Sequence, residues 1–268
     1  MVAPGPPPRI DPSVYVTDWY DEFVPWLKGR REDIRRAGSR VKLARPPAPG
    51  QHWALVGKTG YGKSTFAAGV LDLRKYVFAL DPKGEDETLE AAGFTRITGV
   101  PPHKPFPKEV QRALDEGRGS KVVVGLATRT RRADAANREL MEQALEYARQ
   151  AGGWSLYVDE YQILADGRMY NLGTEVSRLL ISARRDMLSV LTSFQAPSWV
   201  PKVATRQATI VCVWPTQDED MIKNAARAAG RPWRRVKAIL EETEQYNVLV
   251  IPDDIKAPMM IVKPPKVG

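Results

Sequence analysis

The stretch that decides the fold is Gly57-Lys58-Thr59-Gly60-Tyr61-Gly62-Lys63-Ser64, which fits the phosphate-binding pattern G-x-x-x-x-G-K-[ST]. The apolar run Trp53–Val56 precedes it and Thr65–Leu71 follows, which predicts a buried strand, a tight loop and a helix. Glycines let consecutive backbone N–H groups point at phosphate oxygens, and the helix N-terminus adds the positive end of its dipole. A glycine-rich turn that matches by chance is the alternative. The strand, the helix and the intact Gly-Lys-Ser together favour a nucleotide site.

The residues of this loop have separate expected tasks. Lys63 would reach the β- and γ-phosphates of ATP, and the Ser64 hydroxyl would ligate Mg²⁺. The full set expected to bind the nucleotide is Gly57, Lys58, Thr59, Gly60, Tyr61, Gly62, Lys63, Ser64 and Thr65.

Composition sets broad limits on the protein. Its 268 residues carry a net charge of +8, which suits a polyanionic partner, although many soluble proteins are equally basic. The single cysteine, Cys212, excludes an internal disulfide, and its apolar neighbours indicate a core residue and not a nucleophile. No apolar segment approaches the roughly 20 residues of a membrane span, and the proline-rich start lacks a signal sequence. We therefore expect a cytoplasmic protein without a membrane span.

Three regions follow one another along the chain. Residues 1–50 read as a proline-rich arm, a helix and a linker, with a basic stretch from Lys28 to Arg45 that is a solvated helix face or a DNA contact. Residues 51–216 alternate strands with helices, which predicts an α/β core with a mostly parallel sheet. Residues 217–268 read as a helical extension with a hairpin and a tail.

The expected elements after the P-loop can be placed by residue range. Strands are expected at 76–80, 121–126, 154–158, 188–192 and 208–213, and a hairpin at 246–251 with 259–262. Helices are expected at 107–116, 132–150, 174–186, 217–229 and 233–242.

The second half of a nucleotide site is predicted at Leu156–Glu160, where two carboxylates end a buried strand. Asp159 would hold Mg²⁺ through water, and Glu160 would polarise the water that attacks the γ-phosphate. By itself, Asp-Glu after a strand is equally a helix cap with a first-turn acid. After a P-loop in the same chain it favours a Walker B pair. This pairing indicates the additional-strand class of P-loop ATPases and argues against GTPases and simple kinases.

Two further features have open interpretations. Gln195, or Thr192 on the same predicted strand, would sense the γ-phosphate, unless the segment is plain turn chemistry before Pro197. Arginines 178, 184 and 185 lie on the helix predicted just upstream. An arginine offered to a neighbouring subunit's ATP would neutralise transition-state charge, and a solvated arginine is the alternative for each of them.

Taken in order, these segments resemble the FtsK–HerA superfamily of DNA-pumping ATPases. The matching pieces are Gly57–Ser64, Asp81–Glu85, Leu156–Glu160, and Ser182–Arg185 running into Thr192–Pro197. The resemblance covers residues 51–215. This chain has Ala196 where the family usually has arginine, directly after the sensor glutamine.

The resemblance implies a RecA-like core of the additional-strand, catalytic-glutamate class, which works as a homo-oligomeric ring, expected to be a hexamer. It implies catalytic roles for Lys63, Glu160 and Gln195, with Arg184 or Arg185 completing a neighbour's site. Double-stranded DNA would pass through the channel, held by phosphate contacts without sequence preference. Basic loops at 129–132 and 231–235 are candidate contacts, or ordinary solvated surface.

The leading hypothesis is therefore an ATP-driven translocase of double-stranded DNA, encoded by a phage or mobile element. A second hypothesis keeps the ATPase but gives it a protein cargo, with a partner bound through the N- or C-terminal tail. A third is a nucleotide-gated binding protein that hydrolyses ATP slowly or not at all.

Overall fold

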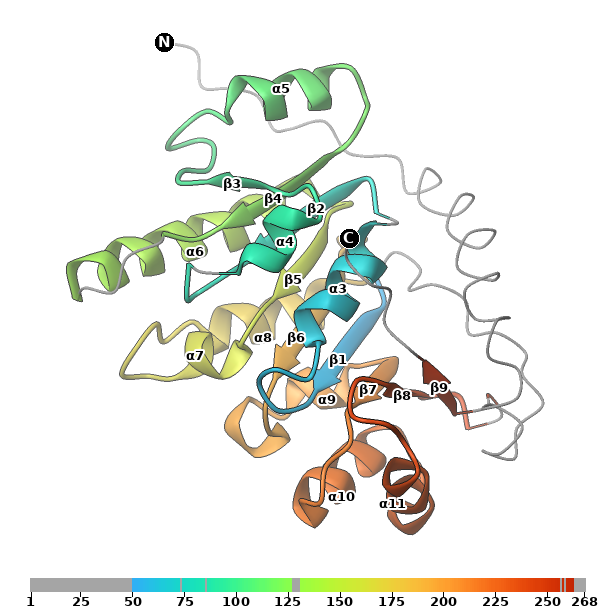
Figure 1. The fold of residues 1–268 in the computed structure, drawn as a ribbon. Helices are drawn as coiled ribbons and strands as arrows, with labels where there is room; N and C mark the ends of the chain where they lie inside the picture. Colours follow the sequence, from blue (N-terminus) through green and yellow to red (C-terminus); the bar gives the residue numbers. More distant parts are fainter. Residues whose placement is uncertain are drawn as a thin grey trace.

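The computed structural model describes residues 50–262, apart from 73, 85, 127–130, 256 and 258, and describes residues 131 and 132 by their backbone alone. The N-terminal arm, its basic stretch and Arg129 lie outside the described residues. Within them, the chain forms a sheet covered by helices on both faces (Figure 1).

The sheet has nine strands in the order β3-β4-β2-β5-β6-β1-β7-β8-β9 among the residues described. The strands are β1 (His52–Val56), β2 (Tyr76–Leu80), β3 (Thr95–Ile97), β4 (Ser120–Val124), β5 (Ser155–Val158), β6 (Ser189–Phe194), β7 (Ile210–Val213), β8 (Val248–Pro252) and β9 (Met260–Val262). The pairs from β3 to β7 are parallel, and β8 and β9 join in antiparallel fashion. The mostly parallel α/β sheet predicted from the alternation is thus confirmed.

The helices divide between the two faces of this sheet. They are α3 (Lys63–Asp72), α4 (Glu87–Ala91), α5 (Lys108–Asp115), α6 (Arg131–Ala151), α7 (Tyr161–Ala165), α8 (Gly173–Ser182), the 3₁₀ turn η2 (Pro197–Trp199), α9 (Val203–Arg206), α10 (Glu219–Ala228) and α11 (Trp233–Glu241). Side chains of α3 and α4 share one apolar core, and those of α5 to α11 share the other. Because both faces are covered, β1 is buried along its whole length, as its continuous apolar sequence requires.

The central strands have the arrangement that places a nucleotide site. β6 lies between β1 and β5, and Leu191 of β6 is in register with Trp53 of β1 and with Tyr157 of β5. One extra strand therefore separates the P-loop strand from the Walker B strand. This is the additional-strand arrangement that the sequence predicted.

Several details differ from the sequence-based expectation. β3 was not predicted, because a three-residue edge strand with one buried side chain carries almost no periodic signal. The short elements α4, α7, η2 and α9 were not predicted either. The helix expected to reach Asp186 is wrong at its end, since α8 stops at Ser182. A turn follows, closed by a bond from the Leu188 N–H to the Ala183 carbonyl, with Met187 at positive φ, which is how helices commonly end. Arg184 and Arg185 lie in this turn and not on the helix.

The C-terminal hairpin continues the core sheet. β8 pairs with β7, and β9 pairs with β8, as the predicted hairpin requires. Asp218 caps α10 by accepting a hydrogen bond from the Met221 N–H at 3.0 Å. The domain boundary at residue 216 stays a prediction. Helices α10 and α11, which follow it, connect β7 and β8, two neighbouring strands of the same sheet.

Candidate nucleotide site

The P-loop joins the carboxyl end of β1 to the first residue of α3. Gly60 and Gly62 have φ of 82° and 87°, a conformation that side-chain-bearing residues rarely adopt. The Gly62 carbonyl then accepts from the Phe66 N–H at 2.9 Å and starts the helix. The glycines of the motif are thus needed for the backbone path that brings N–H groups to the helix N-terminus.

Lys63 is buried inside this loop. Its Nζ donates to the carbonyls of Gly57 at 2.8 Å and Lys58 at 3.1 Å. Burial lowers the pKa of Lys63, although the charges of Glu160 and Asp159 act in the opposite direction. The P-loop follows β1 and the two carboxylates follow β5, so the amine and the carboxylates lie at the same edge of the parallel sheet, where a triphosphate would meet both.

Asp159 follows β5 and is held by two hydroxyl groups. Tyr157 donates to its Oδ1 at 2.8 Å, and Ser193 of β6 donates to the same oxygen. Burial raises the pKa of Asp159 to about 6, more than these hydrogen bonds lower it. This arrangement fits a magnesium site for two reasons. Both hydroxyls occupy Oδ1, so Oδ2 could accept a hydrogen bond from a magnesium-bound water. A bound cation would also offset the cost of burying the charged carboxylate. Ser64, at the start of α3, would be the direct ligand.

Glu160 has a strained backbone and a carboxylate contacted on both oxygens. Its φ and ψ are 42° and 51°, in the left-handed region, and its N–H donates to Ser193 Oγ at 3.2 Å. Lys83 lies 3.0 Å from Oε1, and Gln162 and Gln195 donate to Oε2. Burial alone would raise the pKa of Glu160, but Lys83 first and then Lys63 outweigh it, so the pKa is lowered.

Gln195 connects the two halves of the site. Its Nε2 donates to Thr59 Oγ1 of the P-loop at 3.0 Å and to Glu160 Oε2 at 3.3 Å. The Thr192 hydroxyl instead donates to the Trp53 carbonyl at 3.4 Å, inside the sheet. Of the two candidate sensors, Gln195 is the one that the fold places between the Walker elements.

The arginines lie apart from this site. A Cβ built on Gly50, which precedes β1, would meet Arg184 Cα at 3.0 Å, so Arg184 is at the amino end of β1. The P-loop is at the carboxyl end of the same strand, about 15 Å away for a five-residue strand. Arg185 is exposed and pairs with Asp186, and Arg178 is exposed on α8. Arg184 therefore does not complete the nucleotide site of its own chain.

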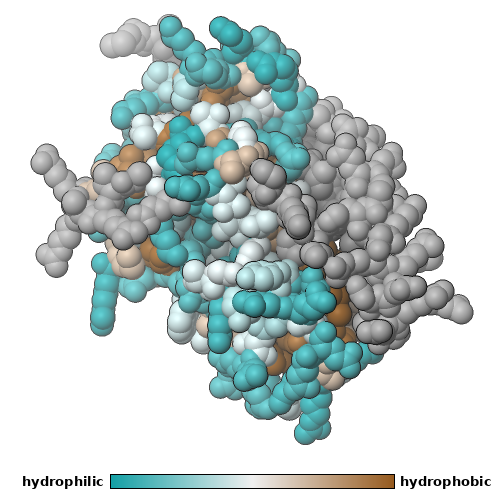
Figure 2. All heavy atoms as spheres, viewed as in Figure 1, coloured by the Kyte–Doolittle hydropathy of each residue, from teal (hydrophilic) through white to brown (hydrophobic). Residues whose placement is uncertain are grey.

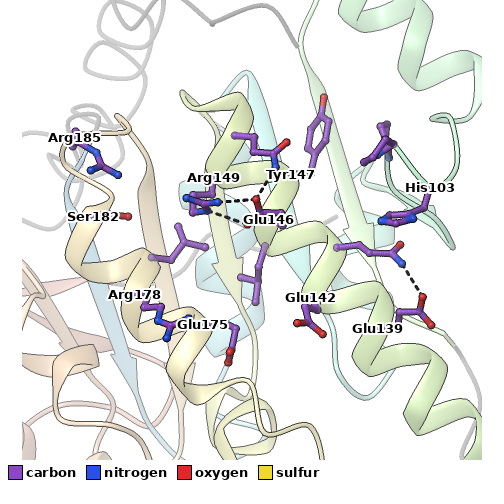
Figure 3. A pocket seen from close by; sticks show the side chains of 16 residues that line it. His103, Glu139, Glu142, Glu146, Tyr147, Arg149, Glu175, Arg178, Ser182 and Arg185 are labelled. Atoms are coloured by element: carbon purple, nitrogen blue, oxygen red, sulfur yellow. Dashed lines mark hydrogen bonds and ion pairs between the residues drawn. The ribbon is translucent and has the colours of Figure 1, made fainter. Parts of the chain in front are cut away.

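A hollow of about 870 Å³ opens between α6 and α8, beside the β3–α5 loop (Figure 3). Its labelled walls are mostly charged and include Glu139, Glu142, Glu146 and Arg149 of α6 and Glu175 and Arg178 of α8. Arg185 lines it, but the P-loop, Asp159 and Glu160 do not. This hollow is not the nucleotide site.

Five contacts in the site were not predicted from the sequence. Ser193 bonds both Asp159 and the Glu160 backbone, and Tyr157 bonds Asp159. Lys83 and Gln162 both contact the Glu160 carboxylate. Tyr157 and Asp159 are two residues apart, and such side chains lie on the same side of an extended chain, which is a usable signal. A serine in an apolar strand is a second one. The Lys83 contact joins residues 77 apart in sequence, and the local sequence carries no signal for it.

Comparison with solved structures identifies the fold. B204, described as the DNA-packaging ATPase from Sulfolobus turreted icosahedral virus, aligns at a TM-score of 0.54 with 18% identity, over 81% of this chain and 98% of that one. The fold is that of a RecA-like P-loop ATPase. VirB4 of Thermoanaerobacter pseudethanolicus aligns at a TM-score of 0.56 with 12% identity, over 80% of this chain and 89% of that one.

B204 has also been crystallised with the ATP analogue AMPPCP, and that structure aligns at a TM-score of 0.52 with 16% identity, over 81% of this chain and 99% of that one. These likenesses show a shared fold, which is the fold that the resemblance to the FtsK–HerA superfamily predicted. Comparisons with protein-family models and with curated proteins found no match.

Proposed function

We propose that this protein hydrolyses ATP to move double-stranded DNA, as one subunit of a ring. The observation that carries the proposal is the meeting of Lys63, Asp159 and Glu160 at one edge of the sheet, with Gln195 joining Glu160 to the P-loop. Structural neighbours described as a genome-packaging NTPase and a DNA-packaging ATPase support the choice of cargo.

Each group has a task in this reaction. The P-loop backbone and Lys63 bind the phosphates, and Ser64 and Asp159 hold magnesium, which when bound neutralises charge on the phosphate oxygens. Glu160 stays ionised and orients the attacking water, since its lowered pKa keeps it in the accepting form. Gln195 contacts both the P-loop and Glu160 and is the proposed γ-phosphate sensor.

The ring is supported by the position of Arg184. An arginine at the far end of β1 can serve a nucleotide site only in a neighbouring copy, where Arg184, or Arg185 next to it, would meet the γ-phosphate. A closed ring of identical subunits, six in our proposal, gives every site such a neighbour.

DNA binding is supported by charge. The net charge of +8 favours a polyanion, and the face shown in Figure 2 is hydrophilic over most of its described surface. Arg234 and Arg235 of α11 are exposed and remain candidate contacts. Within the described residues, no helix combines the length and apolar character that a bilayer crossing requires. We propose a cytoplasmic, phage- or mobile-element-encoded motor that binds a protein partner through its N- or C-terminal tail.

The test measures ATP turnover of the full chain with and without duplex DNA, together with the E160Q variant and the surface control E219Q. We expect DNA to stimulate turnover at low salt, with stimulation falling steeply as salt rises. E160Q should bind ATP and lose turnover by about 10²-fold or more, while E219Q behaves as wild type. Turnover indifferent to DNA would indicate a protein cargo, and an E160Q variant with wild-type turnover would refute the catalytic assignment.

A further inference from the structure

The turn Asp81–Gly84 after β2 has no task in the proposed function, yet its fold is closely specified. Asp81 is 1% exposed, and its Oδ1 accepts from the N–H groups of Lys83 at 3.1 Å and Gly84 at 3.0 Å. Its Oδ2 accepts from the Asp86 N–H at 2.9 Å and from Arg96 Nη2 at 3.1 Å. One buried carboxylate thus folds the whole turn around itself.

The turn delivers Lys83 to the candidate catalytic glutamate. Lys83 Nζ lies 3.0 Å from Glu160 Oε1, with side chains 42% and 6% exposed. Gln195 Nε2 donates both to the other oxygen, Oε2, and to Thr59 Oγ1 of the P-loop. The ammonium group therefore holds one oxygen of Glu160 and leaves the other directed to the side where the triphosphate would bind.

Two buried polar residues support the turn from behind. The Tyr170 hydroxyl donates to the Pro82 carbonyl at 2.7 Å, and Asn137 Nδ2 lies 3.3 Å from that hydroxyl. Asn137 Oδ1 in turn accepts from the Leu126 N–H at 2.8 Å, just past the end of β4. Tyr170 and Asn137 are 2% and 1% exposed. Buried polar groups are costly unless satisfied, so this chain of bonds fixes the position of the Pro82 carbonyl and with it Lys83.

We infer that Lys83 is a positioning residue for Glu160 and that Tyr170 and Asn137 act through it. The inference rests on the proposed function, because it assigns Glu160 the water-orienting role. Without Lys83, Oε1 of Glu160 loses its contact with the ammonium group, and the carboxylate is held through Oε2 alone, by Gln162 and Gln195. The resulting loss is in the orientation of water and not in the binding of ATP.

The test compares kcat and KM for ATP in K83M, K83R, Y170F and the double variant K83M/Y170F. K121M is the matched control, because Lys121 also pairs with a carboxylate, Asp72, at a distant place in the sheet. We expect K83M to lower kcat about tenfold with KM unchanged within twofold, and K83R to recover most of the loss. Y170F should lower kcat by a smaller factor and add nothing to K83M, since both changes act on one contact. K121M should match wild type.

Several outcomes would overturn the inference. A K83M enzyme with kcat equal to wild type removes the positioning role, and one with raised kcat makes Lys83 a brake on Glu160. If Y170F lowers only the melting temperature, or if its effect adds fully to that of K83M, Tyr170 does not act through Lys83. Wild type and E160Q are measured in the same assay. If K83M turns over ATP as fast as wild type, only the positioning role of Lys83 is refuted. If the wild type itself does not turn over ATP, the proposed function is refuted as well.

Discussion

Asp159 and Glu160 are adjacent in the chain, yet their surroundings shift their pKa values in opposite directions. Burial raises the pKa of Asp159 to about 6, whereas Lys83 and Lys63 outweigh burial and lower that of Glu160. Environments that separate two carboxylates in this way commonly give them separate roles. Asp159 is suited to bind a cation, which would stabilise its ionised form. Glu160 is suited to stay ionised and accept a hydrogen bond from water.

A single buried histidine should make the stability of the fold depend on pH. Burial lowers the pKa of His52 from 6.5 to about 4; the nearby backbone of Leu180 opposes this, and the charge of Arg184 adds to it. Between pH 6.5 and pH 4, the His52 imidazole is therefore protonated in the unfolded chain and neutral in the folded chain. Stability from this group is complete above pH 6.5 and is lost as the pH falls towards 4. His52 alone should cost about 2 kcal/mol of stability at pH 5 relative to pH 7.5, whereas the raised pKa of Asp159 acts in the opposite direction.

Urea unfolding across this pH range measures the effect. The chain has two histidines, so H103Q leaves His52 as the single imidazole and serves as the control. H103Q should keep the wild-type pH dependence, and H52Q should lose about 2 kcal/mol less stability than H103Q between pH 7.5 and pH 5. An NMR titration of His52 in H103Q with a midpoint near 6.5 would contradict the prediction.

At the scale of elements, an arginine from the α10–α11 turn ties that helical pair to the segment between β8 and β9. Arg231 donates to the carbonyls of Ile255, Asp254 and Ala257 at 2.6–2.7 Å and to that of Pro252 at 3.3 Å. Burial lowers its pKa, with the charge of Arg235 acting in the same direction. Among the basic residues at 231–235, Arg231 thus has a structural task.

Removing this guanidinium should destabilise the C-terminal elements. We expect R231A to lower the free energy of unfolding by about 2 kcal/mol, because several carbonyls lose a charged donor. R235A, exposed in the first turn of α11, is the matched control and should stay within about 0.5 kcal/mol of wild type. Urea denaturation of both variants decides the matter. If R231A and R235A are equally stable, water hydrogen-bonds to these carbonyls as well as Arg231 does.

At the scale of the whole molecule, the parallel sheet separates two functional edges. The P-loop, Asp159, Glu160 and Gln195 follow the carboxyl ends of β1, β5 and β6, where open α/β sheets bind ligands. Arg184 precedes β6 and lies beside Gly50, two residues before β1. A subunit built in this way has the candidate nucleotide site at one edge and Arg184 at the other, which is the arrangement that the proposed head-to-tail ring needs.

Mixing two inactive variants tests this geometry. K63A lacks a working P-loop but keeps its arginines, and the double variant R184A/R185A has the reverse defect. Each alone should lose most of its turnover. Their mixture should regain a measurable fraction, because some interfaces pair an intact P-loop with an intact arginine pair. Intact ATP binding by R184A/R185A is the control for folding. A mixture no more active than its parts would contradict a role for these arginines in a neighbouring site.

The local sequence determined the features that depend on neighbouring residues. The glycine spacing of the P-loop requires positive φ at Gly60 and Gly62, the apolar runs require buried strands, and Asp159-Glu160 follows one of them. These are short-range constraints of backbone geometry and burial, so they can be predicted without the fold. Cys212 as a core residue was predictable for the same reason and is confirmed.

Only the tertiary structure decided which distant segments meet. The insertion of β6 between β1 and β5 brings Ser193 to Asp159 and Gln195 to Glu160, and the place of β2 next to β5 brings Lys83 to Glu160. Strand order is set by how all the helices and strands bury their apolar faces together, and no single segment carries that information. The candidate phosphate-binding residues could therefore be predicted from the sequence, and the residues that contact the candidate catalytic carboxylate could not.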